Sequence, residues 1–183
     1  MIRTKAELKQ YMKRDMAFYY AQSRHERIMC WLLKDPVFYI AKYIRLLRKE
    51  EYYFNAGKGL WGKVCYLYYL RQKNRLGNEL GFKIPHNCFG PGLTIYHHGG
   101  IIINESAKIG ADCKLHGDNC IGNNGISNDN PRIGDGLDMG VGAKIIGSVI
   151  LGDHVTVGAN AVVTRSNSRH GITLLGIPAK EKE

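Results

Sequence analysis

The chain has 183 residues, of which 44% are hydrophobic, and a formal net charge of +10 at pH 7. This composition provides enough apolar side chains for a packed core, and the lack of a long apolar run excludes a helical membrane span. The five Cys residues show no paired spacing and no apolar signal segment follows the N-terminus, so the sequence predicts a cytoplasmic protein.

Positive charge and tyrosine are concentrated in the first part of the chain. Residues 1–83 contain 18 Lys or Arg against 7 Asp or Glu, residues 84–183 contain 8 against 9, and ten of the eleven Tyr precede residue 84. We therefore predict an α-helical N-terminal region, 1–81, and a second domain, 82–183. The basic surface is interpreted as a solvated helix face over an aromatic core, with peripheral attachment to the inner face of a membrane as an alternative. It contains no recognised nucleic-acid motif, so no nucleic-acid partner is expected.

Four helices are predicted in the N-terminal region. Thr4 and Glu7 form a capping box that opens the first helix, and Pro36 is placed to open the third. Gly77 is expected to end the fourth helix, because glycine is common just after a helix. The predicted helices span residues 5–23, 25–33, 37–53 and 60–76.

In the second domain the aliphatic residues recur with a period of six. Neither the helical period of 3.6 nor the strand period of two explains this spacing, which is typical of a β-helix solenoid. One inward side chain per hexad and three hexads per coil give stacked triangular coils with a continuous core. The sequence thus predicts a mainly β fold whose open end is capped by the N-terminal helices. The repeat positions are Ile103, Ile109, Leu115, Ile121, Ile133, Met139, Ile145, Leu151, Val157 and Val163.

Stacking of residues one coil apart predicts three inner rows. Ser127 is the polar member of these rows and falls in a doubled step between Ile121 and Ile133. We expect either that this hexad loops out of the coil or that Ser127 lies at a slack corner. The predicted rows are Ile95, Leu115, Ile133 and Leu151; Ile103, Ile121, Met139 and Val157; and Phe89, Ile109, Ser127, Ile145 and Val163.

A second irregularity in the repeat marks a candidate site. Eight residues instead of six separate the core positions Ile95 and Ile103, so the segment around His97 must leave the coil as a bulge. Irregular segments on a rigid scaffold often carry functional side chains. Stacking one coil further on is expected to bring His116 beside Tyr96 and therefore next to this bulge.

The chemistry expected at this bulge is that of imidazole, the usual general base near neutral pH. His97 and His116 are the candidate catalytic residues, and Glu105 is a candidate to orient an imidazole or to stabilise its charge. Two imidazoles also suggest a metal site, but no third ligand has a known zinc spacing, so no metal is predicted. His154 is expected to be a bystander, and His98 either a bystander or a contact of the substrate.

Several segments of the second domain form a longer pattern: Gly90–His97, Gly99–Asn104, Ile133–Asp135, Gly140–Gly147, Gly158–Val163 and Gly176–Lys180. Over about residues 82–181 this pattern resembles the hexapeptide acyltransferases, in the subgroup of serine acetyltransferases and polysaccharide O-acetyltransferases. The resemblance implies a left-handed parallel β-helix, a homotrimer with active sites between solenoids, acetyl-CoA as co-substrate and His97 as general base. It implies that the coenzyme meets Gly142, Ala143, Ala159, Asn160, Arg165 and Lys180.

Three positions depart from the serine acetyltransferase pattern and bear on the acceptor. Tyr96 stands where those enzymes have an Asp, Asn130 where they have a second His, and Phe82 where an Asp orients the catalytic His. We therefore predict a saccharide acceptor, small or lipid-linked, of capsule or exopolysaccharide synthesis, contacted by Tyr96, His98 and Asn130. The alternatives are serine O-acetylation in cysteine synthesis and a non-catalytic solenoid that serves as a scaffold.

Overall fold

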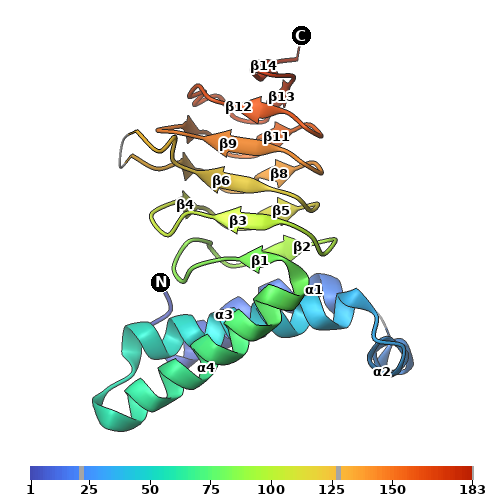
Figure 1. Cartoon of the computed structure of the whole chain (residues 1–183), viewed down its shortest axis with the longest axis vertical. Helices are drawn as coiled ribbons and strands as arrows, with labels where there is room; N and C mark the ends of the chain where they lie inside the picture. The colour runs from blue at the N-terminus through green and yellow to red at the C-terminus, as the bar shows by residue number, and fades with distance from the viewer. Residues whose placement is uncertain (21–22, 127–128, 183) are drawn as a thin grey trace.

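The computed structural model describes residues 1–20, 23–126 and 129–182. It shows a layer of helices beneath a stack of coils made of short strands, with the C-terminus at the far end of the stack (Figure 1). Successive coils pair with each other, so that the strands of one face run parallel through the stack, apart from the last strand of the chain. The predicted order of an α-helical region followed by a mainly β solenoid is confirmed.

In the described part of the chain four helices precede the solenoid, and the starts of the first and third follow the sequence signals. Thr4 caps the first helix through the predicted capping box with Glu7. Asp35 caps the third helix, in which Pro36 occupies the first turn. The helices are α1 (Lys5–Tyr19), α2 (Arg24–Leu32), α3 (Pro36–Ala56) and α4 (Gly59–Leu80).

The prediction that Gly77 ends the fourth helix is wrong. α4 continues to Leu80, and Gly81 follows with a φ of 79°, in the left-handed conformation of a C-terminal cap. A Cβ atom on Gly77 would lie 2.6 Å from the carbonyl oxygen of Phe82, so the close approach of the first solenoid strand requires glycine there. The helix therefore ends next to the start of the solenoid, and a domain boundary between residues 81 and 82 stays a prediction.

Three faces make up the solenoid. The first face contains β1 (Phe82–Lys83), β3 (Ile101–Ile103), β6 (Cys120–Gly122), β9 (Lys144–Ile146) and β12 (Val162–Val163). The second contains β4 (Lys108–Ile109), β7 (Arg132–Ile133) and β10 (Ile150–Leu151). The third contains β2 (Thr94–Ile95), β5 (Lys114–Leu115), β8 (Asp138–Met139), β11 (Thr156–Val157), β13 (Thr173–Leu175) and the antiparallel β14 (Lys180–Glu181).

The inner rows agree with the prediction in the first coils and differ from it beyond Ile121. Leu115 pairs with Met139 and not with Ile133 as predicted. The cause is the connection 123–131 between β6 and β7, which adds one hexad and shifts every later row. The predicted position of Ser127 lies outside the described residues. The observed rows are Ile95, Leu115, Met139, Val157 and Leu174; Ile103, Ile121, Ile145 and Val163; and Phe89, Ile109, Ile133 and Leu151.

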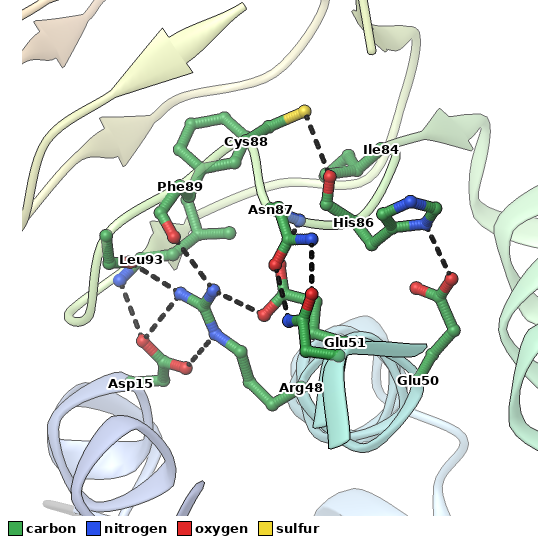
Figure 2. Close-up of polar contacts among 12 residues, drawn as sticks. Asp15, Arg48, Glu50, Glu51, Ile84, His86, Asn87, Cys88, Phe89 and Leu93 are labelled. Atoms are coloured by element: carbon green, nitrogen blue, oxygen red, sulfur yellow. Dashed lines mark hydrogen bonds and ion pairs between the residues drawn. The ribbon is translucent and has the colours of Figure 1, made fainter. Parts of the chain in front are cut away.

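The helical layer closes the N-terminal end of the solenoid, as predicted. α1, α3 and α4 lie against the first coil (Figure 1). Tyr43 of α3 packs edge-on against Phe82 of β1 with ring centroids 5.2 Å apart, and both side chains are buried. Buried polar side chains of α1 and α3 also reach the first coil (Figure 2). Each of the described helices is too short or too polar to cross a membrane.

Candidate active site

One edge of the solenoid brings together most of the predicted site residues. It consists of the connections from the third face to the first, residues 96–100, 116–119, 140–143 and 158–161, and we call it the histidine edge. Main-chain hydrogen bonds join its layers, with the N–H of Gly142 3.0 Å from the carbonyl oxygen of Gly117. The predicted site residues on this edge are Tyr96, His97, His98, His116, Gly142, Ala143, Ala159 and Asn160.

The segment that carries His97 is held in place on both sides. Two residues before His97, the hydroxyl of Tyr19 donates to the carbonyl oxygen of Ile95 at 2.8 Å and accepts from its N–H at 2.9 Å. Two residues after His97, the N–H of Gly99 donates to the carbonyl oxygen of Leu80 at 3.0 Å. Since the side chain of His97 is exposed, a fixed main chain presents its imidazole to solvent.

Asp118 fixes the end of this bulge and is a residue that sequence reasoning missed. Its carboxylate accepts a hydrogen bond of 2.8 Å from the N–H of Gly100. Gly99 has a φ of 130°, and a Cβ atom on it would lie 3.0 Å from a carboxylate oxygen of Asp118. The bulge therefore depends on glycine at this position, where the chain bends around an acidic side chain of the next coil.

His116 lies beside Tyr96, as predicted, and forms a pair that was not predicted. The two rings stack with centroids 4.5 Å apart, and the ring of Phe18 in α1 meets Tyr96 edge-on at 5.0 Å. Nε2 of His116 lies 2.9 Å from a carboxylate oxygen of Asp138. A charged carboxylate requires a hydrogen on that nitrogen, so Nδ1 is the acceptor of the neutral ring. The shifted row explains the miss, because the predicted stacking did not bring Asp138 next to His116.

Three predicted site residues lie at the edge between the first and second faces. Glu105 follows β3, Asn130 precedes β7 and Arg165 follows β12, so the coil geometry separates them from the histidine edge of the same chain. Among the described residues of this chain no contact joins Glu105 to His97, so the orienting role of Glu105 stays a prediction. Lys180 is exposed in β14, and the N–H of Ala179 beside it bonds to β12, so Lys180 stays near the histidine edge.

The buried thiols are unsuited to nucleophilic catalysis. Cys88 and Cys113 are buried, and burial raises the pKa of both thiols, that of Cys88 to about 12. The thiolate, which is the reactive form, is therefore scarce at neutral pH. Within the described residues no cluster of three or more His, Cys, Asp or Glu side chains is arranged to hold a metal ion.

We expect the native protein to react incompletely with a thiol reagent at pH 8. Cys88 and Cys113 should stay unlabelled because they are buried and protonated, whereas the half-buried Cys30 and Cys65 should react. Titration with Ellman's reagent checks this, and guanidinium should expose all five thiols. Rapid labelling of Cys113 in the folded protein would contradict the packing described above.

The fold and the histidine edge define a hexapeptide-repeat β-helix, and solved structures provide its hand. The serine acetyltransferase from Brucella abortus strain S19 matches with a TM-score of 0.73 at 22% identity, over 97% of this chain and 70% of that chain. A serine acetyltransferase in complex with CoA matches with a TM-score of 0.70 at 22% identity, over 97% and 71%. These similarities confirm the predicted left-handed parallel β-helix.

The sequence is also similar to serine acetyltransferases. That of Buchnera aphidicola subsp. Acyrthosiphon pisum is 30% identical over 151 residues, which cover 79% of this chain and 52% of the relative. The chain spans about half the length of such relatives, between 52% and 57% for the first three. No family model matches the chain.

Proposed function

We propose that the histidine edge transfers an acetyl group from acetyl-CoA to an acceptor hydroxyl, with His97 as the general base. One observation carries the proposal: the coils align His97 with the corners at Gly142, Ala159 and Asn160, where the coenzyme is expected. The similarity to serine acetyltransferases, one of them solved in complex with CoA, supports this reaction.

The reaction requires one proton acceptor and an electrophile bound beside it. His97 takes the proton of the acceptor hydroxyl through a ring nitrogen while the hydroxyl oxygen attacks the thioester carbonyl carbon. The C–S bond of the tetrahedral intermediate then breaks, CoA leaves as a thiolate, and the proton passes from His97 to the thiolate or to water. Main-chain N–H groups at the tight corners are suited to stabilise the oxyanion. Burial raises the pKa of Cys88, Cys113 and Cys120, the last of which follows the histidine edge, so direct transfer is favoured over an acyl-cysteine intermediate.

His116 is proposed as the second residue in contact with the acceptor. Asp138 holds its Nε2, and Tyr96 covers one face of its ring, so Nδ1 remains to accept a hydrogen bond from an acceptor hydroxyl. This arrangement places a carboxylate-oriented imidazole beside the bulge. In the serine acetyltransferase pattern an aspartate orients the catalytic imidazole, but here that position is Phe82, a buried core residue. Asp138 offers an orienting carboxylate in its place.

We expect Asp138→Asn to lower kcat about tenfold, because the carboxamide leaves the orientation and tautomer of His116 undefined. The KM for acetyl-CoA should change less than kcat, because the side chain of Asp138 contacts His116 and Lys114 and not the coenzyme corners at Gly142 and Ala143 that follow it in the chain. Steady-state kinetics at varied acetyl-CoA check the prediction, with Asp153→Asn as control, because that exposed carboxylate belongs to another edge. Equal kcat values for Asp138→Asn and the unmodified protein would remove His116 from the mechanism.

L-Serine is the first acceptor that we propose, because the similar proteins are serine acetyltransferases. A saccharide hydroxyl is the second, and the ring wall of the site favours it. The ring of Tyr96 lies between those of Phe18 and His116. A carboxylate at the position of Tyr96 would suit the ammonium group of an amino acid, but Tyr96 offers none. A neutral acceptor does not need that carboxylate.

A homotrimer is part of the proposal. Glu105, Asn130 and Arg165 lie on a different edge of this chain, and a neighbouring solenoid in a ring of three would present them to the histidine edge. This arrangement would complete the predicted coenzyme and acceptor contacts between subunits. Sedimentation equilibrium tests it, and a monomer that is fully active would contradict it.

Release of CoA thiol tests the proposed function. The protein is mixed with acetyl-CoA and either L-serine, a panel of neutral and acidic saccharides, or buffer. We expect thiol release that depends on the acceptor, with serine and saccharides compared by kcat/KM. Thiol release at the buffer rate with every acceptor would overturn the proposed transfer and favour a scaffold.

A further inference from the structure

In the middle coils of the solenoid the main-chain groups form hydrogen bonds with the neighbouring coil on each side. On one side of the first coil, side chains replace the neighbouring coil as hydrogen-bond partners. Toward the next coil the first coil makes main-chain bonds, such as 2.9 Å from the N–H of Tyr96 to the carbonyl oxygen of Leu115. Among the described residues no coil precedes it on the second and third faces. On that side its main-chain groups meet buried side chains of α1 and α3 instead (Figure 2).

Arg48 of α3 supplies the donors. Its guanidinium donates to the carbonyl oxygens of Phe89 at 3.0 Å and Gly90 at 2.6 Å. The charge is balanced by Asp15 at 2.7 Å and Glu51 at 2.9 Å, and the side chains of this network are buried. Bonds to both carbonyl groups and both carboxylates fix the guanidinium plane and, with it, the course of the first coil.

Asp15 and Tyr19 of α1 extend this set of hydrogen bonds along the first coil toward the segment that carries His97. One carboxylate oxygen of Asp15 accepts from the N–H of Gly92 at 2.7 Å and from that of Leu93 at 3.0 Å. The hydroxyl of Tyr19 then bonds to both main-chain groups of Ile95. A hydroxyl can donate once and accept at the same time, so one side chain replaces two bonds of a missing strand.

We infer that Asp15, Tyr19 and Arg48, here called the helix clamp, position His97 for catalysis. This inference rests on the proposed acetyl transfer. Tyr19 acts closest to the chemistry, since Ile95 lies two residues before His97, and the end of α4 holds the chain two residues after it. A displacement of the base by about 1 Å can cost about 100-fold in rate, so the clamp bears directly on kcat. The helical region is then a working part of the active site, beyond its role as a cap.

Tyr19→Phe tests the inference, because it removes only the hydroxyl. We expect kcat to fall by about tenfold or more, with the KM for acetyl-CoA within about twofold, since the coenzyme corners lie on later coils. Tyr43→Phe is the matched control. Tyr43 is equally buried in the helical layer, and its hydroxyl interacts with the main chain of Ile84, away from His97. It should lose stability in the same way and retain kcat.

Amide hydrogen exchange provides a readout that is independent of activity. We expect Tyr19→Phe to speed exchange at Ile95 and in the segment 96–101, and Tyr43→Phe to leave that segment unchanged. Equal kcat values for Tyr19→Phe and Tyr43→Phe, or unchanged exchange at Ile95, would overturn the clamp and leave the proposed transfer standing. If the unmodified protein transfers no acetyl group, the proposed function fails, and exchange alone then decides whether Tyr19 holds the segment.

Discussion

His97→Ala should lower kcat for acetyl transfer by about 10²- to 10⁴-fold, the range that a positioned general base contributes. The substitution removes an exposed side chain from a main chain that Tyr19 and Leu80 hold, so the fold and the melting temperature should be preserved. Steady-state release of CoA thiol measures the loss. The KM for acetyl-CoA should stay within about twofold, because an effect confined to kcat marks an interaction made in the transition state.

His98→Ala is the matched control for this prediction. His98 is the adjacent exposed imidazole on the same bulge, so its removal makes the same change in charge and size. We expect kcat to change by less than about threefold. The KM should rise only for an acceptor that His98 contacts. A His97→Ala protein that is as active as His98→Ala would show that the base is another residue.

Arg48→Met should cause the largest loss of stability, about 3–5 kcal/mol in the free energy of unfolding. The substitution keeps an unbranched side chain but leaves Asp15 and Glu51 buried without their cation, and it leaves the carbonyl groups of Phe89 and Gly90 without a donor. Urea unfolding followed by circular dichroism measures the change. Loss of folded protein on expression would be the extreme form of the same result.

Arg75→Met serves as the control for Arg48→Met. Arg75 pairs with Glu79 on the surface of α4, with 78% of its side chain exposed, so its removal should change the urea midpoint little. Similar midpoints for the two variants would contradict the view that the buried ion network holds the helices to the solenoid.

The sequence was sufficient for the solenoid because its repeat is a local signal. One inward aliphatic residue per hexad is visible without knowledge of distant contacts, and it correctly stacked Leu115 on Ile95 and His116 on Tyr96. The predicted stacking failed beyond Ile121. The connection 123–131 adds one hexad, so the period of six continues while each later residue moves to a different inner row. The pair of His116 and Asp138 was missed for that reason.

The helix clamp could not be predicted because its partners are far apart in the sequence. Arg48 lies 33 residues from Asp15 and 41 from Phe89 along the chain. Its place on a basic helix face predicts a solvated side chain, whereas the structure buries Arg48 completely. Only the docking of α1 and α3 on the first coil converts these residues from surface charges into partners of the main chain.

We propose that the histidine edge transfers acetyl groups through His97. Mass spectrometry of the acceptor after incubation with acetyl-CoA tests it most directly, with the unmodified protein, His97→Ala and His98→Ala at equal concentration. We expect an O-acetylated product with the unmodified protein and with His98→Ala, and little or none with His97→Ala. Absence of an acetylated product with L-serine and with every saccharide, or equal product from His97→Ala, would contradict it.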